Sequence, residues 1–361
     1  MKLSKLTVQY LITLGLGAVT LSGCGGGGST GTSVSPSRYS LVDIGTLPTG
    51  TDTQPIAIND AGVAVGYGNT TSVTTGYHPF VYSPLTGITE IIPPGGKSAS
   101  AVASGVNSQG EIVHTNLTGT MSCFLTNATG NPTVSLSINP SYQISSATGL
   151  TDAGLVVGFE TGAPAGTTGF EYSTSTGLTE NLGQLAAGQS SVALASSVNG
   201  YIAGRSAVVS GAFHGFILAP GSATPTDVDP NSTYGSSRNN AINSRGDTAG
   251  ALQQTTSVAT HAFVYTAATG ITPVPELAGA TESWLMGINL ADRAVGYCTV
   301  NGVTTGVVYS ASQGMQDLNS LVFRAAGWRI IRAVAINNNG WILAAATQDS
   351  VHNHAVILKP L

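Results

Sequence analysis

The densest group of side chains that could bind a ligand lies near the C-terminus. It falls within nine positions and consists of Arg324, Trp328, Arg329 and Arg332, in a chain with only 12 lysines and arginines among 361 residues. Arginine and tryptophan are strongly enriched at binding hot spots, because a guanidinium can hold a carboxylate through two hydrogen bonds and an indole can stack on a ring. The group predicts a site for an anionic glycan or a carboxylate-bearing partner. The alternative is that Trp328 packs inside the fold and leaves the arginines solvated.

A metal site is a second possibility, because histidines recur at one position of a repeat: His78, His214, His261 and His354. Equivalent positions point into separate environments, so we expect each histidine to be a polar residue at the start of a strand that bonds a neighbouring loop. His352 and His354, two apart on one strand face, would suit two ligands of zinc or copper, but no third ligand is evident. We predict no metal and no cofactor.

Calcium binding and hydrolysis have weaker support. The segment Asp227–Asn231 begins with the carboxylate spacing of a calcium loop, but Ser232 stands where the loop needs glycine and Arg238 where it needs glutamate. A polar connecting loop is the better interpretation. No Gly-x-Ser-x-Gly elbow lies on a strand-to-helix transition. The 17 acidic residues leave room for a carboxylate pair of the glycosidase type, but the sequence does not show which two would meet, so no catalytic residue is predicted.

The first 24 residues have the features of an export signal. Lys2 and Lys5 give a positively charged start, and Leu6–Thr20 is an apolar stretch too short and too early for an ordinary spanning helix. The signal ends Leu-Ser-Gly-Cys24, which resembles a bacterial lipobox and implies a diacylated Cys24. By the same resemblance Gly25, in place of aspartate, favours the outer membrane. An ordinary secretory signal with an incidental cysteine is the alternative.

We therefore expect a signal peptide at 1–23, a lipidated Gly/Ser-rich tether at 24–38 and a folded domain at 39–361. The tether composition cannot bury a core. After residue 24 the chain has 10 basic and 17 acidic residues, a net charge of −7, which argues against nucleic acid as a partner. Cys123 and Cys298 fall at non-equivalent positions of distant repeats, so we predict small buried hydrophobes instead of a disulfide.

A unit of about 46 residues recurs seven times and defines the fold. Its marker is a tight turn inside an alternating apolar stretch, as in Ile58-Asn59-Asp60-Ala61-Gly62, and we call it the marker turn. The last turn residues, 44 to 48 positions apart, are Gly62, Gly110, Gly154, Gly200, Gly246, Asp292 and Gly340. Glycine supplies the positive φ that such a turn needs, and aspartate tolerates it. A period of this length with four short strands predicts an all-β, seven-bladed β-propeller of four-stranded blades.

Two patterns assign strands to places in a blade. Before each marker turn the first strand carries a small residue: Ala57, Gly105, Gly149, Ala195, Ala241, Gly287 and Ala335. Crowding near an axis explains this choice, so we place the first strand innermost. The third strand carries runs of large residues such as Phe80-Val81-Tyr82, which predicts a strand covered on both faces.

The two ends of the domain complement each other. Tyr39–Ile44 has the pattern of a fourth strand without the three before it, and His354–Leu358 that of a third strand without a fourth. We predict that Leu41–Ile44 pairs with Val356–Leu358 as the outer strand of blade seven, which would close the ring and remove an open edge.

Several motifs recur in register over residues 39–361. The His-Ala-Phe-Val-Tyr segment at 261–265, the marker turns, and the closing Asp317-Leu318-Asn319 with Gly327-Trp328 resemble the HAF-type extracellular repeat family of bacterial proteins. The resemblance implies export and a propeller-like repeat, without an established activity.

These observations together predict a lipid-anchored, monomeric protein of the cell envelope, held by its acyl chains and facing either the periplasm or the outside. Its predicted function is that of a non-catalytic binding or scaffolding module for an envelope protein or a surface glycan. One alternative is an envelope hydrolase or lyase with a site at the mouth of the propeller channel. Another is a structural surface component that assembles with itself.

Overall fold

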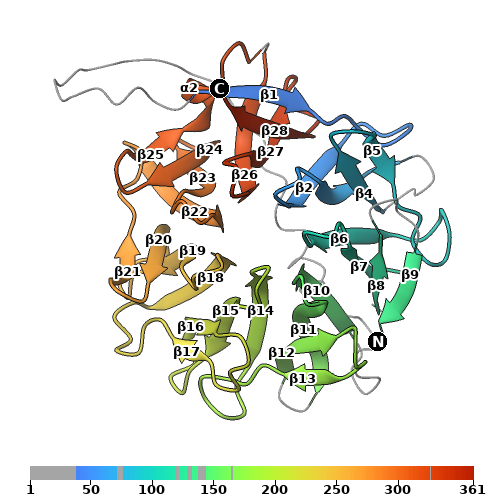
Figure 1. The fold of residues 1–361 in the computed structure, drawn as a ribbon. Coiled ribbons are helices and arrows are strands. Elements are labelled where there is room, and N and C mark those ends of the chain that lie inside the picture. Colours follow the sequence, from blue (N-terminus) through green and yellow to red (C-terminus); the bar gives the residue numbers. More distant parts are fainter. Residues whose placement is uncertain are drawn as a thin grey trace. The chain divides into compact units, whose positions relative to one another are not determined.

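The structure is a computed structural model that describes residues 38–70, 76–118, 122–127, 132–136, 144–163, 166–325 and 327–361. These residues belong to one compact unit, Ser35–Leu361. In that unit seven four-stranded antiparallel sheets surround a central axis, so the predicted seven-bladed β-propeller is confirmed (Figure 1). The predicted signal peptide, Cys24 and the tether up to residue 37 lie outside the described residues. Within the described residues, no helix has the length and apolar character needed to cross a membrane.

The blades follow one another along the chain. Blades one and two comprise β2 (Thr53–Ile58), β3 (Ala64–Gly68), β4 (His78–Ser83), β5 (Gly87–Glu90), β6 (Ala101–Val106), β7 (Ile112–Asn116), β8 (Ser122–Thr126) and β9 (Pro132–Leu136). Blades three and four comprise β10 (Ile144–Leu150), β11 (Leu155–Ala163), β12 (Gly166–Ser173), β13 (Thr179–Asn181), β14 (Ser191–Ser196), β15 (Ile202–Ala207), β16 (Phe213–Leu218) and β17 (Thr226–Asp227). Blades five and six comprise β18 (Ser236–Ile242), β19 (Thr248–Gln253), β20 (Thr260–Thr266), β21 (Gly270–Pro273), β22 (Ala280–Ile288), β23 (Ala294–Val300), β24 (Val303–Ser310) and β25 (Gly314–Asp317). Blade seven comprises β26 (Arg329–Ile336), β27 (Ile342–Thr347), β28 (His354–Pro360) and β1 (Tyr39–Asp43).

The first strand of each blade is the innermost, as predicted, and contacts the first strands of both neighbouring blades (Figure 1). A Cβ atom added to Gly105 would lie 3.1 Å from the backbone nitrogen of Leu150, and one added to Gly287 would lie 3.0 Å from the Cα of Ala335. Close approach of backbones therefore explains the small residues. All seven blades also have a β-bulge directly before that residue, which the sequence did not predict.

The marker turns have the predicted conformation. Their glycines have φ between 74° and 96°, and Asp292 takes the same region with φ 55°. The turns are also joined into a ring, because asparagine side chains reach the next blade. Nδ2 atoms donate in this way from Asn59 to the Asn107 carbonyl, Asn107 to Thr151, Asn199 to Ser244, Asn243 to Asn289, Asn289 to Asn337 and Asn337 to Asn59. Between blades three and four the Asp152 amide donates to the Val198 carbonyl. We call this set the turn ring.

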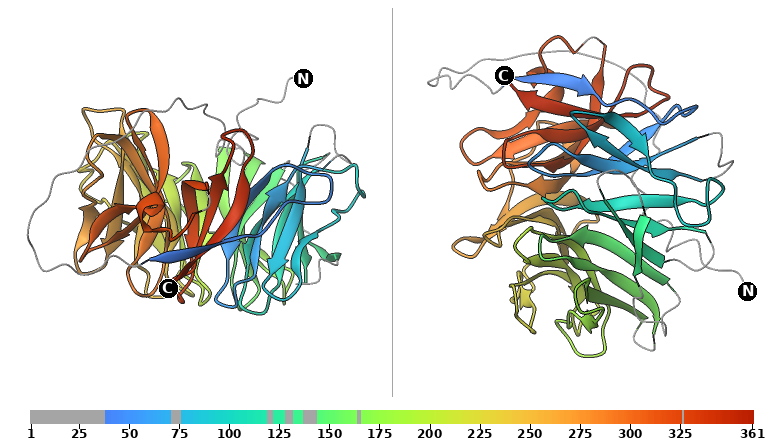
Figure 2. Two further views of the ribbon diagram at one scale, coloured as in Figure 1. Left: turned by 90° about the horizontal axis from the view of Figure 1, so that it is seen from above. Right: turned by 45° about the vertical axis from the view of Figure 1, so that its right-hand side comes forward.

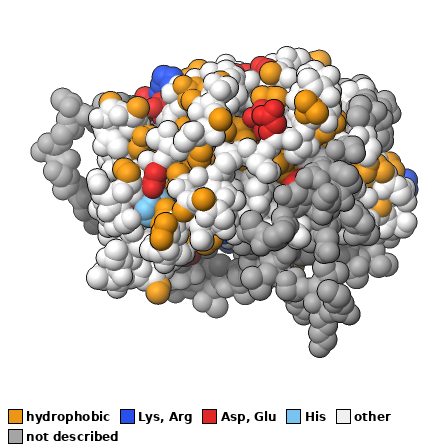
Figure 3. Space-filling model, turned by 90° about the horizontal axis from the view of Figure 1, so that it is seen from below, with side chains coloured by type: hydrophobic (Ala, Val, Ile, Leu, Met, Phe, Trp, Pro, Cys, Tyr) orange, Lys and Arg blue, Asp and Glu red, His pale blue; other side chains and the backbone are white. Residues whose placement is uncertain are grey.

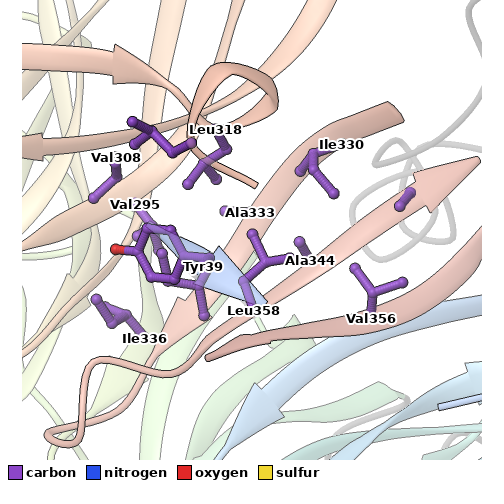
Figure 4. Close-up of a cluster of buried hydrophobic side chains, with 13 residues drawn as sticks. Tyr39, Val295, Val308, Leu318, Ile330, Ala333, Ile336, Ala344, Val356 and Leu358 are labelled. Carbon is purple, nitrogen blue, oxygen red and sulfur yellow. The ribbon is translucent and has the colours of Figure 1, made fainter. Parts of the chain in front are cut away.

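The predicted closure is also confirmed. Strand β1 pairs antiparallel with β28, with Leu41 opposite Leu358, and lies along the outer edge of blade seven (Figure 2). The Tyr39 side chain is fully buried in the blade-seven core, beside the short helix α2 (Leu318–Leu321) (Figure 4). Its hydroxyl accepts a hydrogen bond from Arg293 Nη2 at 2.5 Å. The closing strand therefore contributes core as well as backbone pairing.

The interior between blades is mostly apolar, and the surface carries few charges. In the third strands successive residues are buried, as Phe80 and Val81 are at 0% and 3% exposure and Phe216 and Ile217 at 1% and 8%, which confirms that these strands are covered on both faces. Cys123 and Cys298 are buried and are not joined by a disulfide, as predicted. Burial raises the pKa of both thiols to about 12. The described part of the face in Figure 3 shows mostly apolar and uncharged polar side chains with few scattered charges.

Candidate functional site

The four residues of the predicted C-terminal patch do not meet at one place. Arg324 lies on the exposed loop after α2, with its guanidinium 5.0 Å from the ring centroid of Phe323. Arg329 begins β26 and donates from Nη1 to the Thr304 carbonyl of blade six at 3.1 Å. Ligand binding by this group of four stays a prediction, but the geometry separates its members.

Trp328 and Arg332 belong to two different regions. Trp328 is partly buried against the blade-seven core, and its ring centroid is 5.2 Å from that of His354. Arg332 lies on the innermost strand β26, is 9% exposed, and donates from Nη2 to Gln54 Oε1 at 2.6 Å. Trp328 and Arg332 are thus close in sequence but contact different parts of the propeller.

Arg332 occupies a position that recurs in every blade, three residues before the small residue of the first strand. Blades five, six, seven and one carry Arg238, Trp284, Arg332 and Gln54 at this position. The remaining blades carry Val102, Ser146 and Val192. Long polar and aromatic side chains therefore occupy one arc of the innermost strands. Aligning the seven repeats at this position is the sequence signal that could have found Arg238 and Trp284, which the sequence analysis missed.

The second strands add residues to this arc and to blade four beside it. Tyr67 lies opposite Gln54, Tyr297 opposite Trp284, and Arg205 opposite Val192. We call Arg205, Arg238, Trp284, Tyr297, Arg332 and Tyr67 the arginine–aromatic cluster.

One contact between blades and one within a blade connect Arg238, Trp284 and Tyr297 of the cluster. The Arg238 guanidinium lies 5.1 Å from the centroid of Trp284 in the next blade, within cation–π range. Trp284 in turn stacks on Tyr297, with 6.4 Å between centroids and 16° between planes. Arg205 lies 4.4 Å from the centroid of Phe213. A pocket of about 240 Å³ lies between these blades, with Arg205, Arg238 and Trp284 in its wall.

The cluster concentrates positive charge. Burial and the nearby charge of Arg238 lower the pKa of Arg205 to about 10. Burial also lowers the pKa of Arg238 and of Arg332. Neither Arg238 nor Arg332 forms an ion pair with a carboxylate in the described part of the chain.

A carboxylate, Glu282, also lies close to this arc. Burial and then Glu282 raise the pKa of Tyr297 to about 12, and Glu282 itself accepts a hydrogen bond from Thr299 at 3.0 Å. The guanidinium groups of Arg238 and Arg332, which are buried or partly buried and have no carboxylate partner among the described residues, favour an anionic ligand.

The recurring histidines point into separate environments, as predicted, but their partners differ from the expectation. Each Nδ1 bonds a carboxylate on or just after the outermost strand of its own blade, instead of a neighbouring loop: His78 with Glu90, His214 with Asp227, His261 with Glu276 and His354 with Asp43. His352 precedes β28, so it does not share a strand face with His354, and it bonds Asp349. Among the described residues, no three or more His, Cys, Asp or Glu side chains are placed to hold a metal ion.

The segment with calcium-like spacing forms a connecting loop between blades four and five, as interpreted. Asp229 is 4% exposed, and its carboxylate accepts hydrogen bonds from the amides of Thr233 and Tyr234 at 2.9 and 3.0 Å. Asp227 bonds His214 and the Asp229 amide. The carboxylates of Asp227 and Asp229 therefore stabilise the loop through hydrogen bonds.

Two buried titratable groups, His114 and Glu160, lie outside the cluster. Burial lowers the pKa of His114 to about 4 and raises that of Glu160 to about 7. Val113 packs against blade three, so its neighbour His114 points towards blade one, whereas Glu160 has the orientation of Val156 and points towards blade two. They occupy different blade interfaces and do not form an acid–base pair.

Comparison with known proteins supports the fold. No protein-family model matches the chain. A search of curated proteins also finds no match. Similar solved structures include TolB from Acinetobacter baumannii (9% identity, TM-score 0.47, 70% of this chain and 62% of TolB). They also include the β-propeller domain of the Trilobed protease from Pyrococcus furiosus (7%, 0.51, 90% and 97%) and oligogalacturonate lyase from Vibrio parahaemolyticus (10%, 0.54, 88% and 93%).

At these identities the likeness establishes the propeller fold alone. The Pyrococcus domain has an open velcro topology, whereas the pairing of β1 with β28 closes the ring of this chain.

Proposed function

We propose that this protein is a lipid-anchored component of the bacterial cell envelope whose propeller is a non-catalytic binding module. Its ligand carries carboxylates and is an acidic surface glycan or an acidic segment of an envelope protein. The arginine–aromatic cluster is the binding site.

One observation carries the proposal: the cluster gathers positive charge in a chain whose formal net charge is −5. Keeping the Arg238 and Arg332 guanidinium groups buried or partly buried without carboxylate partners costs folding free energy, and an anionic ligand would offset that cost. The rings of Trp284 and Tyr297 would cover the apolar part of the ligand, while Arg238 and Arg332 would bind its carboxylates.

The proposed envelope location and lipid anchor are inferred from the N-terminal export signal. The lipobox-like ending at Cys24 supports acylation, and the Gly/Ser tether would hold the propeller away from the membrane. The resemblance to HAF-type repeats supports export. The same proposal places the anchor in the outer membrane and has the protein function as a single propeller.

The catalytic alternative, a hydrolase or lyase at the channel, requires carboxylates or histidines from different blades to converge. The cluster instead brings arginines and aromatic rings together. The pKa of about 12 makes Tyr297 a poor base at neutral pH. Binding therefore has the stronger support.

Capture from cells tests the proposal. A tagged full-length chain is cross-linked in its native host, and the captured material is compared with that from an Arg238→Met, Arg332→Met variant. Methionine keeps much of the side-chain volume, so the propeller should stay folded. We expect a carboxylate-rich protein or glycan whose yield falls at least tenfold in the variant and stays unchanged in the exposed control Arg324→Met. Equal capture by the double variant, or capture of the chain alone, would contradict the proposed site.

A further inference from the structure

A second pocket lies at the ring closure, and none of its wall residues belongs to an innermost strand. It has a volume of about 290 Å³ and is bounded by the β1–β2 loop, the β27–β28 loop and Trp328. The arginine–aromatic cluster contributes no residue to it. Its volume is at the lower end of the range for small-molecule sites.

Trp328 is the one large apolar side chain in the wall of this pocket. The other wall residues are glycine or polar, including Thr51, Asp349, His352 and His354. Packing against the blade-seven core and contact with the His354 ring hold the indole in place. The pocket thus combines one fixed aromatic surface with several hydrogen-bonding groups.

Both imidazoles of the pocket are oriented by carboxylates. His352 Nδ1 lies 2.6 Å from Asp349 Oδ2, and His354 Nδ1 lies 3.1 Å from Asp43. The second Asp349 oxygen accepts the His352 amide at 2.8 Å, which fixes the loop that carries both groups. Since Nδ1 of each ring is engaged, Nε2 is left to bond a ligand.

We propose that this pocket is a carbohydrate-binding site for one uncharged sugar ring. A pyranose has an apolar face of C–H groups, which would lie on the Trp328 indole, and hydroxyls around its edge, which would bond His352, His354 and Thr51. The pocket favours an uncharged sugar because Asp349, the carboxylate in its wall, is already paired with His352, and Asp43, outside the wall, is paired with His354. Groups oriented in advance lose little entropy on binding, which suits recognition of a small polar ligand.

Ligand-detected NMR on the full-length protein in a non-glycosidic detergent tests this site. The probes are glucose, galactose, mannose, N-acetylglucosamine and N-acetylgalactosamine, each titrated to 20 mM, on the order of the weak affinity expected of a single ring. We expect saturable binding of at least one sugar, at least a fivefold loss in His352→Ala, and no detectable binding in Trp328→Ala. His352→Ala is a surface change that should not unfold the blade, so it decides the question if Trp328→Ala is unstable.

Two controls separate this site from the arginine–aromatic cluster. Trp341→Phe changes a tryptophan outside the pocket, and Arg238→Met changes the cluster; neither should alter sugar binding. The inference is overturned if none of the five sugars binds, or if binding is unchanged in His352→Ala. A failure here leaves the proposed anionic ligand untouched, because that ligand is tested with different probes and different variants.

Discussion

At the residue scale, the asparagine of the marker turn has two tasks. Its Oδ1 accepts backbone amides of its own turn, as Asn337 does from Trp341 at 2.9 Å. Its Nδ2 donates to the turn of the next blade, as Asn337 does to the Asn59 carbonyl at 3.0 Å. Aspartate could perform the first task but lacks the donor for the second. This explains why asparagine recurs at this position.

Asn337→Asp isolates the second task. We expect the variant to lose about 1–3 kcal/mol of unfolding free energy, because a buried carbonyl loses its donor and a buried charge takes its place. Urea unfolding of both proteins measures the loss. Asn231→Asp, an exposed loop position, should change stability by less than about 0.5 kcal/mol. Equal stabilities of Asn337→Asp and wild type would show that the turn ring does not hold the blades together.

The sequence revealed the marker turns through their glycines but not the role of their asparagines. A glycine with positive φ leaves a local signal, whereas the Asn59–Asn107 contact joins residues 48 positions apart. The predicted C-terminal patch shows the same limit of prediction from local sequence. Arg324, Trp328, Arg329 and Arg332 are close in sequence and fall in different surroundings.

At the element scale, strand order and closure could be predicted because each rests on a pattern within a few residues. In the sequence, Tyr39–Asp43 has the pattern of an outer strand without a blade of its own, and the last repeat has no outer strand. The two segments pair in the structure. The seven bulges could not be predicted, because a shift in register between two strands has no residue type of its own. The short helix α2 was also missed, although Asp317 caps it by accepting the Asn319 amide at 2.9 Å.

Tyr39 provides the test of the closure. Tyr39→Ala should cost about 3–5 kcal/mol of unfolding free energy, because it empties a fully buried ring position and weakens the outer strand. Tyr39→Phe keeps the ring and loses only the hydrogen bond from Arg293, so its cost should be about 1–2 kcal/mol. Thermal or denaturant unfolding gives both values. If Tyr39→Ala were as stable as Tyr39→Phe, the closing strand would not contribute to the core.

At the scale of the whole molecule, the candidate site lies where the sevenfold repeat is broken. Every blade has an alanine or glycine, a bulge and a marker turn at equivalent positions, but only blades five, six, seven and one carry a long polar or aromatic side chain at the inner position of Arg238, Trp284, Arg332 and Gln54. A propeller brings together residues one repeat apart and separates residues that are neighbours along a strand. Closeness along the sequence is therefore a poor guide to binding sites in this fold, and alignment of the repeats is a better one.

The proposed lipid anchor also concerns the whole molecule. Cys24→Ala should leave the propeller folded and release it from the membrane, because the acyl chains would be absent. Fractionation of cells after a high-salt wash measures the release, with circular dichroism as the check on folding. A Cys24→Ala protein that still pellets with membranes would contradict the lipidation.

The most direct test of the central claim is a calorimetric titration of the full-length protein with two carboxylate probes, alginate fragments and poly-glutamate, at low and high salt. We predict saturable binding of at least one probe that weakens with salt and falls at least tenfold in the Arg238→Met, Arg332→Met variant. Alginate alone would identify a glycan ligand, and poly-glutamate alone an acidic protein segment. Absence of binding to both probes, or equal affinity in the double variant, would contradict an anion-binding function for the arginine–aromatic cluster.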